Sequence, residues 1–339
     1  MLQTAVFGAS GYAGGEVVKI IDGHPEMSVG FLGAHSRAGV SLGSVQPHLG
    51  GGDRVLADND PAQLPDDVEV AFLALPHGKS TETALSLRDR GIKVVDLGSD
   101  FRLDSNDRYL RGYGSDHPHP EQLADWAYGL PELFEVADED QVAAPGCYPT
   151  AVLLAIAPLA AAGLVDQTSI VADCLSGVSG AGRSARDDLT FGAIAEGVRG
   201  YGLTNHRHRP EIEMGLELAG VPEPRVVFTP HLVPMLRGEL ATVTVPTDTD
   251  VETARSVLKE AYDASPFVSV IDTPPQTRWV VGSNQAMVAV WVDEWTGRLI
   301  SQCGIDNLVK GAAGQAVQCA NLMFGLPEST GLSTAGWMP

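Results

Sequence analysis

The sequence contains little lysine, few aromatic residues and no long uninterrupted apolar run. Five of its 22 basic residues are lysine, its acidic residues number 43, and its formal net charge is −21. Because so negative a surface repels nucleic acid and anionic lipid, we expect neither as a partner. The longest apolar run, from Ala151 to Leu164, is interrupted by Pro158 and is too short to cross a membrane. The acidic surface is either an ordinary solvated one or an adaptation to a salty cytoplasm, where salt screens the carboxylates.

The chain also lacks paired cysteines, metal-ligand spacing and an N-terminal targeting signal. Its cysteines form no CxxC pair and no zinc-like pattern, and they are Cys147, Cys174, Cys303 and Cys319. The first residues have neither the basic nor the apolar segment of a secretory signal. We therefore expect a cytoplasmic protein with free thiols and no bound metal.

The hydrophobic pattern changes about halfway along the chain. In the first half, helical patterns alternate with the apolar runs "TAVFGA", "MSVGFLGA", "VEVAFLALPHG" and "IKVVDLGSDFRL", which predicts an α/β, Rossmann-type doubly wound parallel sheet. One of these helices, "STETALSLRDRG", opens with a serine or threonine as its expected cap. In later segments, apolar and polar residues alternate with period two, as in half-buried strands. These segments also include one helix and a hairpin turn at "DEWTG", which predicts an α+β domain with a mostly antiparallel sheet. We place the first domain at 1–146 and 308–339, and the second at 147–307.

A glycine-rich loop joins the first predicted strand to the first predicted helix. Its spacing is Gly8-x-x-Gly11-x-x-Gly14. Glycines let backbone amides approach a pyrophosphate, and the helix N-terminus adds a partial positive charge. The loop therefore predicts a dinucleotide site, with a tight turn that binds no ligand as the alternative.

The end of the second predicted strand indicates which dinucleotide is bound. An NAD site usually has a carboxylate here for the ribose diol, but this chain reads Ala34, His35, Ser36, Arg37. Ser36 can donate a hydrogen bond and Arg37 can pair with a 2′-phosphate, so we predict NADP rather than NAD. The alternative is that Arg37 is an ordinary surface arginine.

Cys147 lies between a glycine and a Tyr-Pro pair, at the start of a long apolar helix. Gly146 lets the backbone turn closely, and Pro149 fits the first or second helical position. The unpaired amides of a helix start stabilise a thiolate, so Cys147 is a candidate nucleophile. The other three cysteines lie in apolar patterns and are expected in the core.

Two histidines supply a candidate acid–base group. His206 and His208 alternate with Arg207 and Arg209 before a helix expected to begin near Pro210. No third metal ligand is evident, so we interpret one histidine as the acid–base group and the arginines as anion binders. If the segment is extended, the two histidines point to opposite sides and only one faces Cys147. Three further histidines in polar segments are expected to be solvent exposed, namely His24, His117 and His119.

A family resemblance extends along nearly the whole chain. The motifs that carry it are, in order, "GASGYAGGE", "LPHG", "DFRL", "YGLPEL", "PGCYPT", "SGVSGAGR", "HRHRPEI", "FTPHLVPMLRG" and "IDNLVKGAAGQAVQ". Together they resemble the N-acetyl-γ-glutamyl-phosphate reductases, which are similar to aspartate-semialdehyde dehydrogenases. The resemblance implies an NADP-binding Rossmann domain, an α+β catalytic domain, and a homodimer or homotetramer. It also implies reduction of a small-molecule acyl phosphate to a semialdehyde in arginine synthesis.

The resemblance assigns roles to individual residues. It implies that Cys147 forms a thioester and that a histidine of "HRH", either His206 or His208, handles the thiohemiacetal proton. We favour His206 for this role, with His208 and Arg207 in contact with the substrate. It implies cofactor contacts at Gly8, Ser10, Gly11, Tyr12, Ala13, Ser36, Arg37, Ser179, Gly180, Gly182 and Asn307. Arg102 of "DFRL" is either a substrate-phosphate binder or part of a structural salt bridge.

Two other functions stay open. A reductase of aminoadipyl or glutamyl phosphate linked to an acidic carrier protein would share the fold and motifs, but it should offer a basic docking face that this chain lacks. A non-catalytic NADP-sensing regulator would have no reason to keep both the helix-start thiol and the "HRH" segment. Arg209 departs from the family pattern, which has a threonine there.

Overall fold

The computed structural model describes residues 1–50 and 52–338, which form two compact units. The first unit comprises Met1–Asp104, His117–Pro145 and Ala312–Leu332. The second comprises Ser105–Asp116, Gly146–Gly311 and residues 333–338. The predicted domain limits differ from these units mainly in giving 105–116 and the last residues to the first domain. Those limits stay a prediction, and residues 51 and 339 lie outside the described ranges.

The first unit contains a seven-stranded parallel sheet, as the alternation of strands and helices predicts. Its order is β3-β2-β1-β4-β5-β7-β6. The strands are β1 (Leu2–Phe7), β2 (Met27–Ala34), β3 (Ala57–Asp58), β4 (Val68–Leu73), β5 (Lys93–Asp96), β6 (Ala127–Tyr128) and β7 (Gln141–Ala143). Its helices are α1 (Tyr12–Asp22), α2 (Leu42–Val45), α3 (Thr81–Asp89) and α10 (Gly314–Met323). The strand order reverses at β1, and ligands of doubly wound sheets bind at such a switch point.

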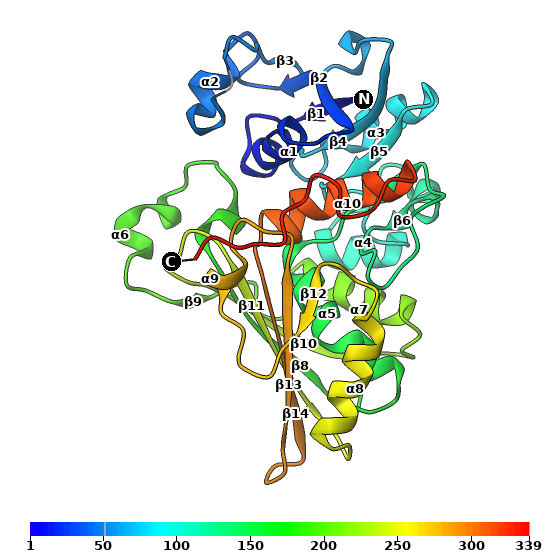
Figure 1. Cartoon of the computed structure of the whole chain (residues 1–339), viewed down its shortest axis with the longest axis vertical. Coiled ribbons are helices and arrows are strands. Elements are labelled where there is room, and N and C mark those ends of the chain that lie inside the picture. Colours follow the sequence, from blue (N-terminus) through cyan, green and yellow to red (C-terminus); the bar gives the residue numbers. More distant parts are fainter. Residues whose placement is uncertain (51, 339) are drawn as a thin grey trace. The chain divides into compact units, whose positions relative to one another are not determined.

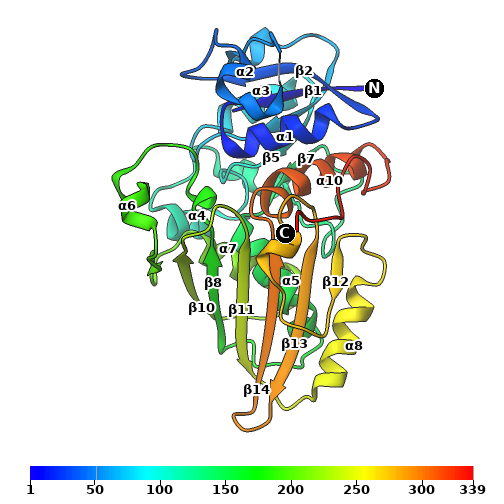
Figure 2. The same ribbon diagram turned by 60° about the vertical axis from the view of Figure 1, so that its left-hand side comes forward.

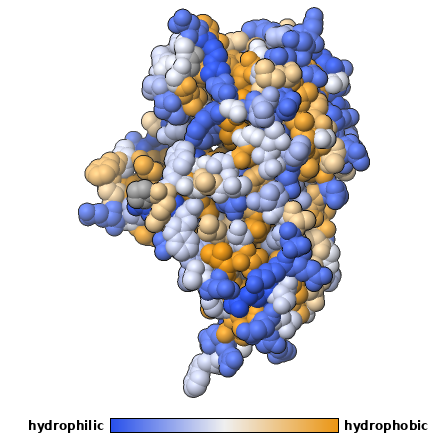
Figure 3. All heavy atoms as spheres, in the orientation of Figure 1, coloured by the Kyte–Doolittle hydropathy of each residue, from blue (hydrophilic) through white to orange (hydrophobic). Residues whose placement is uncertain are grey.

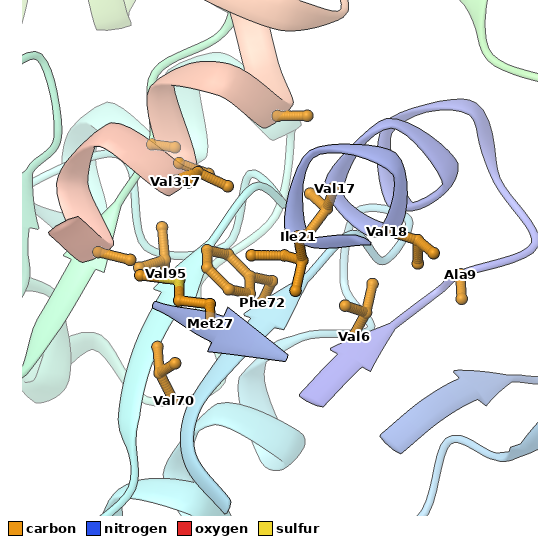
Figure 4. Close-up of a cluster of buried hydrophobic side chains, with 14 of the residues drawn as sticks. Val6, Ala9, Val17, Val18, Ile21, Met27, Val70, Phe72, Val95 and Val317 are labelled. Atoms are coloured by element: carbon orange, nitrogen blue, oxygen red, sulfur yellow. The ribbon is translucent and has the colours of Figure 1, made fainter. Parts of the chain in front are cut away.

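Small and branched apolar residues fill the core of the first unit. Val6 and Phe72 from the sheet pack with Ile21 of α1 and Val317 of α10 (Figure 4). The helix α10 contacts both α1 and β5, and it follows a short π-helical segment, Val309–Ala313. The small residues of this last helix allow that close packing.

The start of α3 corrects one prediction about capping. The side chain of Ser80, the cap residue, makes no capping hydrogen bond. Instead, the buried carboxylate of Asp100 accepts the backbone N–H groups of Gly78 (2.7 Å), Ser80 (3.0 Å) and Thr81 (3.1 Å). The cap therefore comes from the segment after β5, a long-range contact that the local sequence does not indicate.

The second unit contains a mixed, mostly antiparallel sheet, as predicted. Its order is β12-β13-β14-β11-β8-β10-β9, and the pairs β8–β10 and β12–β13 are parallel. The strands are β8 (Ile170–Ser176), β9 (Arg199–Gly200), β10 (Val226–Leu232), β11 (Glu239–Pro246), β12 (Val268–Val270), β13 (Ala286–Asp293) and β14 (Arg298–Ile305). The expected hairpin at "DEWTG" joins β13 to β14.

Helices cover one face of the second sheet. Figures 1 and 2 show α5 and α8 on the same side of the long strands, and α5 also packs on α7. The helices of this unit are α4 (Asn106–Tyr113), α5 (Cys147–Ala161), α6 (Phe191–Ile194), α7 (His208–Leu218), α8 (Val251–Tyr262) and α9 (Thr277–Val280). Along β11, every second residue is buried, beginning with Glu239. The alternation thus turns one side of β11 toward α5 and leaves the other side partly exposed.

Two of the three histidines expected in solvent are buried. His24 is 5% exposed, and its Nε2 lies 3.0 Å from Oδ1 of Asn321. His117 is 3% exposed beside the ring of Phe101, and burial lowers its pKa. The polar residues beside these histidines in the sequence predict exposure, but contacts with more distant residues bury both side chains. Among the described residues, no helix has the length and apolar character needed to cross a membrane.

Candidate active site

Cys147 is the first residue of α5, as the sequence predicts. Gly146 precedes it in an extended conformation (φ −67°, ψ 157°) and has no side chain to cap the helix. Cys147 is partly exposed, whereas the other three cysteines are buried. Pro149 is the third helical residue, one position later than expected. The partial positive charge of a helix start favours a thiolate at this position.

Two residues that the sequence analysis missed shape the surroundings of Cys147. Glu211 of α7 accepts the backbone N–H of Gly146 at 2.8 Å, so its carboxylate fixes the turn before the cysteine. A Cβ atom on Gly311 would lie 2.7 Å from the Cβ of Cys147, so only glycine leaves room there. Both residues lie in quoted motifs, "HRHRPEI" and "IDNLVKGAAGQAVQ", but nothing local in the sequence shows that they meet Cys147.

His206 and His208 lie together, which corrects the expectation for an extended segment. Their ring centroids are 4.8 Å apart, and both pack edge-on against Tyr148, at 5.9 and 5.8 Å. The chain turns here because His208, not Pro210, begins α7. Nδ1 of His206 accepts the backbone N–H of His208 at 3.1 Å, which leaves the hydrogen of the neutral ring on Nε2. Burial and the charge of the exposed Arg207 lower the pKa of His206 to about 4.

Two tyrosines extend this cluster. The hydroxyl of Tyr201 donates to that of Tyr148 at 3.1 Å, and Tyr148 donates to the backbone carbonyl of His231 at 3.3 Å. Burial raises the pKa of Tyr201 to about 12 and also raises that of Tyr148. Both hydroxyls are therefore neutral at pH 7 and can serve as donors.

A buried carboxylate lies next to the Cys147 thiol. Glu239, the first residue of β11, is fully buried, and burial raises its pKa to about 8. The nearby Cys147 thiol opposes part of that shift in pKa. The sequence analysis did not single out this residue, although period-two alternation along "GELATVTV" places it on the buried face.

Some of the expected cofactor residues are grouped in the second unit. Nδ2 of Asn307 donates to Oγ of Ser179 at 3.0 Å, and Oδ1 of Asn307 accepts the backbone N–H of Gly238 at 2.8 Å. Gly180 is exposed, and Gly182 has a positive φ of 81°. The structure thus brings Ser179 and Asn307 together although they are far apart in the sequence.

The glycine loop of the first unit has a shape suited to a dinucleotide. A Cβ on Gly8 (φ +80°) would lie 2.2 Å from the carbonyl oxygen of Ala74, and a Cβ on Gly14 would lie 2.2 Å from that of Gly8. Gly11 caps α1 without a side-chain hydrogen bond, so the helix start is bare backbone. The side-chain amide of Gln46, another residue that the sequence analysis missed, donates to the carbonyl of Gly11 at 2.8 Å. A bare helix start of this kind fits a pyrophosphate.

The remaining predicted residues of the first unit differ in exposure. Ser10 of the loop and Ala13 of α1 are partly buried, and Tyr12, the first residue of α1, is exposed. Ser36 and Arg37 are exposed directly after β2, where a 2′-phosphate would be accessible to both.

The side chain of Arg102 donates hydrogen bonds to two backbone carbonyls. It donates through Nε to the carbonyl of Ala144 (2.9 Å) and through an Nη to that of Leu97 (2.8 Å). Both acceptors are backbone carbonyls rather than carboxylates, and the role of Arg102 in substrate binding stays a prediction. Among the described residues, no group of three or more His, Cys, Asp or Glu side chains is arranged to hold a metal ion.

Two family models match the chain. "Semialdehyde dehydrogenase, NAD binding domain" matches residues 3–140, and "Semialdehyde dehydrogenase, dimerisation domain" matches residues 147–307. The chain is also similar to proteins named N-acetyl-gamma-glutamyl-phosphate reductase. The one from Heliobacterium modesticaldum is 43% identical over 351 residues and covers 100% of both chains. The one from Salinispora tropica is 45% identical over 347 residues and covers 100% of this chain and 99% of the relative.

Solved structures share the fold. Aspartate semialdehyde dehydrogenase II from Vibrio cholerae has a TM-score of 0.72 at 20% identity and covers 96% of this chain and 99% of its own. Aspartate semialdehyde dehydrogenase with NADP from Candida albicans has a TM-score of 0.68 at 16% identity, with coverages of 96% and 98%. The predicted fold class is therefore confirmed.

Proposed function

Since the chain belongs to the N-acetyl-γ-glutamyl-phosphate reductase family of semialdehyde dehydrogenases, we propose that it reduces N-acetyl-γ-glutamyl phosphate to N-acetylglutamate semialdehyde and phosphate in arginine synthesis. Its reaction is that of an NAD(P)-dependent oxidoreductase. The observation that carries the proposal is Cys147, a partly exposed thiol at the bare start of α5.

Cys147 supplies the nucleophile in this proposal. Its sulfur attacks the γ-acyl carbon, the bond from that carbon to the phosphate oxygen breaks, and phosphate leaves with the bonding electrons. The product of this step is a thioester on Cys147. The backbone N–H of Cys147, at the positive end of the helix, is suited to donate to the oxygen that becomes negative.

His206 is suited to the second half of the reaction. NADPH supplies a hydride when bound. The Nε2 hydrogen of the neutral His206 ring can be donated to the oxygen of the thiohemiacetal that Cys147 then carries. His208 and Arg207 are proposed to contact the carboxylate or phosphate of the substrate, because Arg207 is an exposed cation in an acidic protein.

We assign NADP to the glycine loop of the first unit. The bare start of α1 and the glycines at positions 8 and 14 support pyrophosphate binding. Exposed Ser36 and Arg37 support recognition of the 2′-phosphate. Replacing Arg37 by alanine should weaken NADPH binding about tenfold or more and leave NADH binding unchanged, as measured by nicotinamide fluorescence. An unchanged NADPH preference would remove Arg37 from the 2′-phosphate site.

The reverse reaction tests the whole proposal. The protein is mixed with NADP⁺, phosphate and N-acetylglutamate semialdehyde, and the absorbance of reduced nicotinamide is followed. We expect continued NADPH formation only when phosphate is present, because phosphate must cleave the thioester before a second turnover; without phosphate, at most one NADPH should form per Cys147. No NADPH formation across a range of salt concentrations, by protein that binds NADPH, would contradict the free acetylated substrate. The carrier-linked substrate would then become the leading alternative.

We further propose a homo-oligomer in the cytoplasm. The match to a dimerisation domain over residues 147–307 supports self-association. Large apolar residues around α6 also support it, because Phe191 is 88% exposed, Val198 62% and Leu203 55%. Figure 3 shows apolar atoms on the surface of this projecting segment, at the left of the view. Mass measurement by light scattering decides between monomer, dimer and tetramer.

A further inference from the structure

Residues 333–338, here called the C-terminal segment, lie against the loop that follows α9. Figures 1 and 2 show this red end of the chain beside α9. The backbone N–H of Asn284 donates to the carbonyl of Ser333 at 2.8 Å, and that of Trp337 donates to the carbonyl of Val281 at 2.8 Å. The segment and the residues that it contacts all belong to the second unit. The backbone alone therefore fastens the C-terminal segment at two points.

The contact between the C-terminal segment and this loop is close enough to require glycine on both sides. A Cβ atom on Gly336 would lie 2.0 Å from the carbonyl oxygen of Trp279. A Cβ atom on Gly282, which has a φ of +81°, would lie 2.3 Å from the indole ring of Trp337. Trp337 nevertheless stays 55% exposed, so burial of its apolar surface explains only part of this fit.

The indole ring of Trp337 also lies over a guanidinium group. Cζ of Arg237 is 5.9 Å from the ring centroid, which is within the range of a cation–π interaction. The same guanidinium donates through Nε and an Nη to Oδ1 of Asp306, at 3.3 and 3.1 Å, and lies 3.0 Å from Oδ2. An aromatic face on one side and a carboxylate at the edge hold the planar guanidinium in one orientation.

Asp306 fixes the backbone of the turn that carries Asn307. Its fully buried carboxylate accepts the backbone N–H groups of Gly282 (2.6 Å), Leu308 (2.8 Å) and Val309 (3.2 Å). Any shift of this carboxylate would leave buried amides without a partner, which is costly. One carboxylate thus joins the loop beneath the C-terminal segment to the turn at Asn307.

Asn307 extends the network to residues expected at the cofactor. Its Oδ1 accepts the backbone N–H of Gly238 at 2.8 Å, and its Nδ2 donates to Oγ of Ser179 at 3.0 Å. The same turn leads to Gly311, whose position leaves no room for a Cβ beside Cys147. Because the hydride must reach the acyl group on Cys147, the part of the cofactor that Ser179 and Asn307 contact is expected to be the nicotinamide.

We propose that Trp337 is a positioning residue for hydride transfer. Its ring holds the ion pair of Arg237 with Asp306, and this pair sets the orientation of Asn307 and Ser179 toward the nicotinamide. The inference rests on the proposed function for its chemistry, whereas the network itself exists in the protein without cofactor. Hydride transfer requires close alignment of donor and acceptor, so it is the step that a loosened network should slow.

The first measurement needs neither cofactor nor substrate. Hydrogen–deuterium exchange of the full-length protein is followed by mass spectrometry that resolves single amides. Trp337→Ala should speed exchange about tenfold at the amides of Gly238, Gly282 and Leu308, because the network protects them. Trp337→Phe keeps an aromatic face over the guanidinium and should stay within about threefold of the wild type.

A second tryptophan provides the matched control. Trp295 is 95% exposed in the hairpin between β13 and β14, away from this network. Trp295→Ala removes the same side chain from the same unit, so it should leave exchange at these amides and both steps of the reaction unchanged.

The second measurement separates the two halves of the reaction in Trp337→Ala. With NADP⁺ and N-acetylglutamate semialdehyde but no phosphate, the rate of the single NADPH formed per Cys147 reports hydride transfer. With N-acetyl-γ-glutamyl phosphate but no NADPH, the first release of phosphate reports thioester formation. We expect the first rate to fall about tenfold and the second to change less than about twofold. A generally damaged site would slow both.

The outcomes separate this inference from the proposed function. Wild-type exchange at all three amides of Trp337→Ala would overturn the inference, and so would equal slowing of both half-reactions. Loss of protection in Trp337→Phe as large as in Trp337→Ala would overturn the role of the aromatic face. If the wild-type protein formed no NADPH from the semialdehyde, the proposed function would fail. The exchange rates would then still decide whether Trp337 holds the network.

Discussion

At the residue scale, the role of one sulfur atom can be tested without changing the fold. Replacing Cys147 by serine should lower reduction by roughly 10³-fold or more, because a hydroxyl at a helix start is a far weaker nucleophile than a thiolate. NADPH binding should stay within about twofold of the wild type. Steady-state turnover and nicotinamide fluorescence check the two expectations.

The control for that variant is the same substitution at a buried cysteine. Cys319 lies in α10, where its sulfur lies 3.4 Å from the carbonyl oxygen of Gly129. A serine hydroxyl can make this contact, so Cys319→Ser should keep its turnover. If Cys147→Ser kept its turnover as well, Cys147 would not be the nucleophile.

The two neighbouring histidines should differ in their effect on the reaction. His206 carries its hydrogen on Nε2 and is proposed to donate it, so His206→Asn should lower turnover by about 100-fold with a smaller change in KM. His208 is buried at the start of α7 and is proposed to bind substrate, so His208→Asn should raise KM more than it lowers turnover. Equal, small losses in both variants would mean that neither is the acid–base group.

At the element scale, two buried aspartates near the start of α3 should respond to pH in opposite ways. Burial and the charge of Asp100 raise the pKa of Asp96 to about 7. Burial alone would raise the pKa of Asp100. Four hydrogen-bonding groups outweigh this effect and hold the pKa below its ordinary value, and they belong to His77, Gly78, Thr81 and Ser80. Asp100 therefore stabilises the fold above about pH 4, whereas the raised pKa of Asp96 lowers stability progressively as the pH rises from about 4 to about 7.

Asparagine at either position tests this assignment. Asp100→Asn should lower the free energy of unfolding by about 2–4 kcal/mol at pH 7, because it loses a charged cap for several amides. Asp96→Asn should gain stability relative to the wild type between pH 5 and 8, because the wild type must bury a charge at the higher pH. Urea unfolding at the two pH values measures both. A wild-type and an Asp96→Asn curve with the same pH dependence would show that Asp96 does not titrate in this range.

The elements that the sequence predicted well are those with a local signal. Strands such as β4 and helices such as α8, with its Asp250 cap, follow from apolar periodicity and turn residues. The short strands β3, β6 and β7 have only two or three residues and leave too little pattern to detect.

Missed features of the site depend on contacts between distant segments. Cys147 was identified because a helix start is visible in the local sequence. Glu211, Glu239 and Gly311 meet it from other elements, and neither periodicity nor spacing encodes such a meeting. The prediction that the two histidines point to opposite sides applies to an extended segment, whereas α7 begins at His208.

At the scale of the whole molecule, charge should make stability depend on salt. Acidic residues exceed basic ones by 21, so pairing every cation with one carboxylate still leaves 21 carboxylates uncompensated. Their mutual repulsion acts over the Debye length, which falls from about 14 Å at 0.05 M salt to about 3 Å at 1 M. The exposed ion pairs that salt would weaken contribute little individually.

We therefore expect the Tm to rise by several degrees between 0.05 and 1 M KCl. A neutral osmolyte at the same water activity serves as the control, because it changes hydration without screening charge. A larger rise with KCl than with the osmolyte identifies screening as the cause. A Tm that falls with KCl would mean that attractive ion pairs, such as Arg237 with Asp306, outweigh the repulsion. In that case the acidic composition would be an ordinary solvated surface rather than an adaptation to salt.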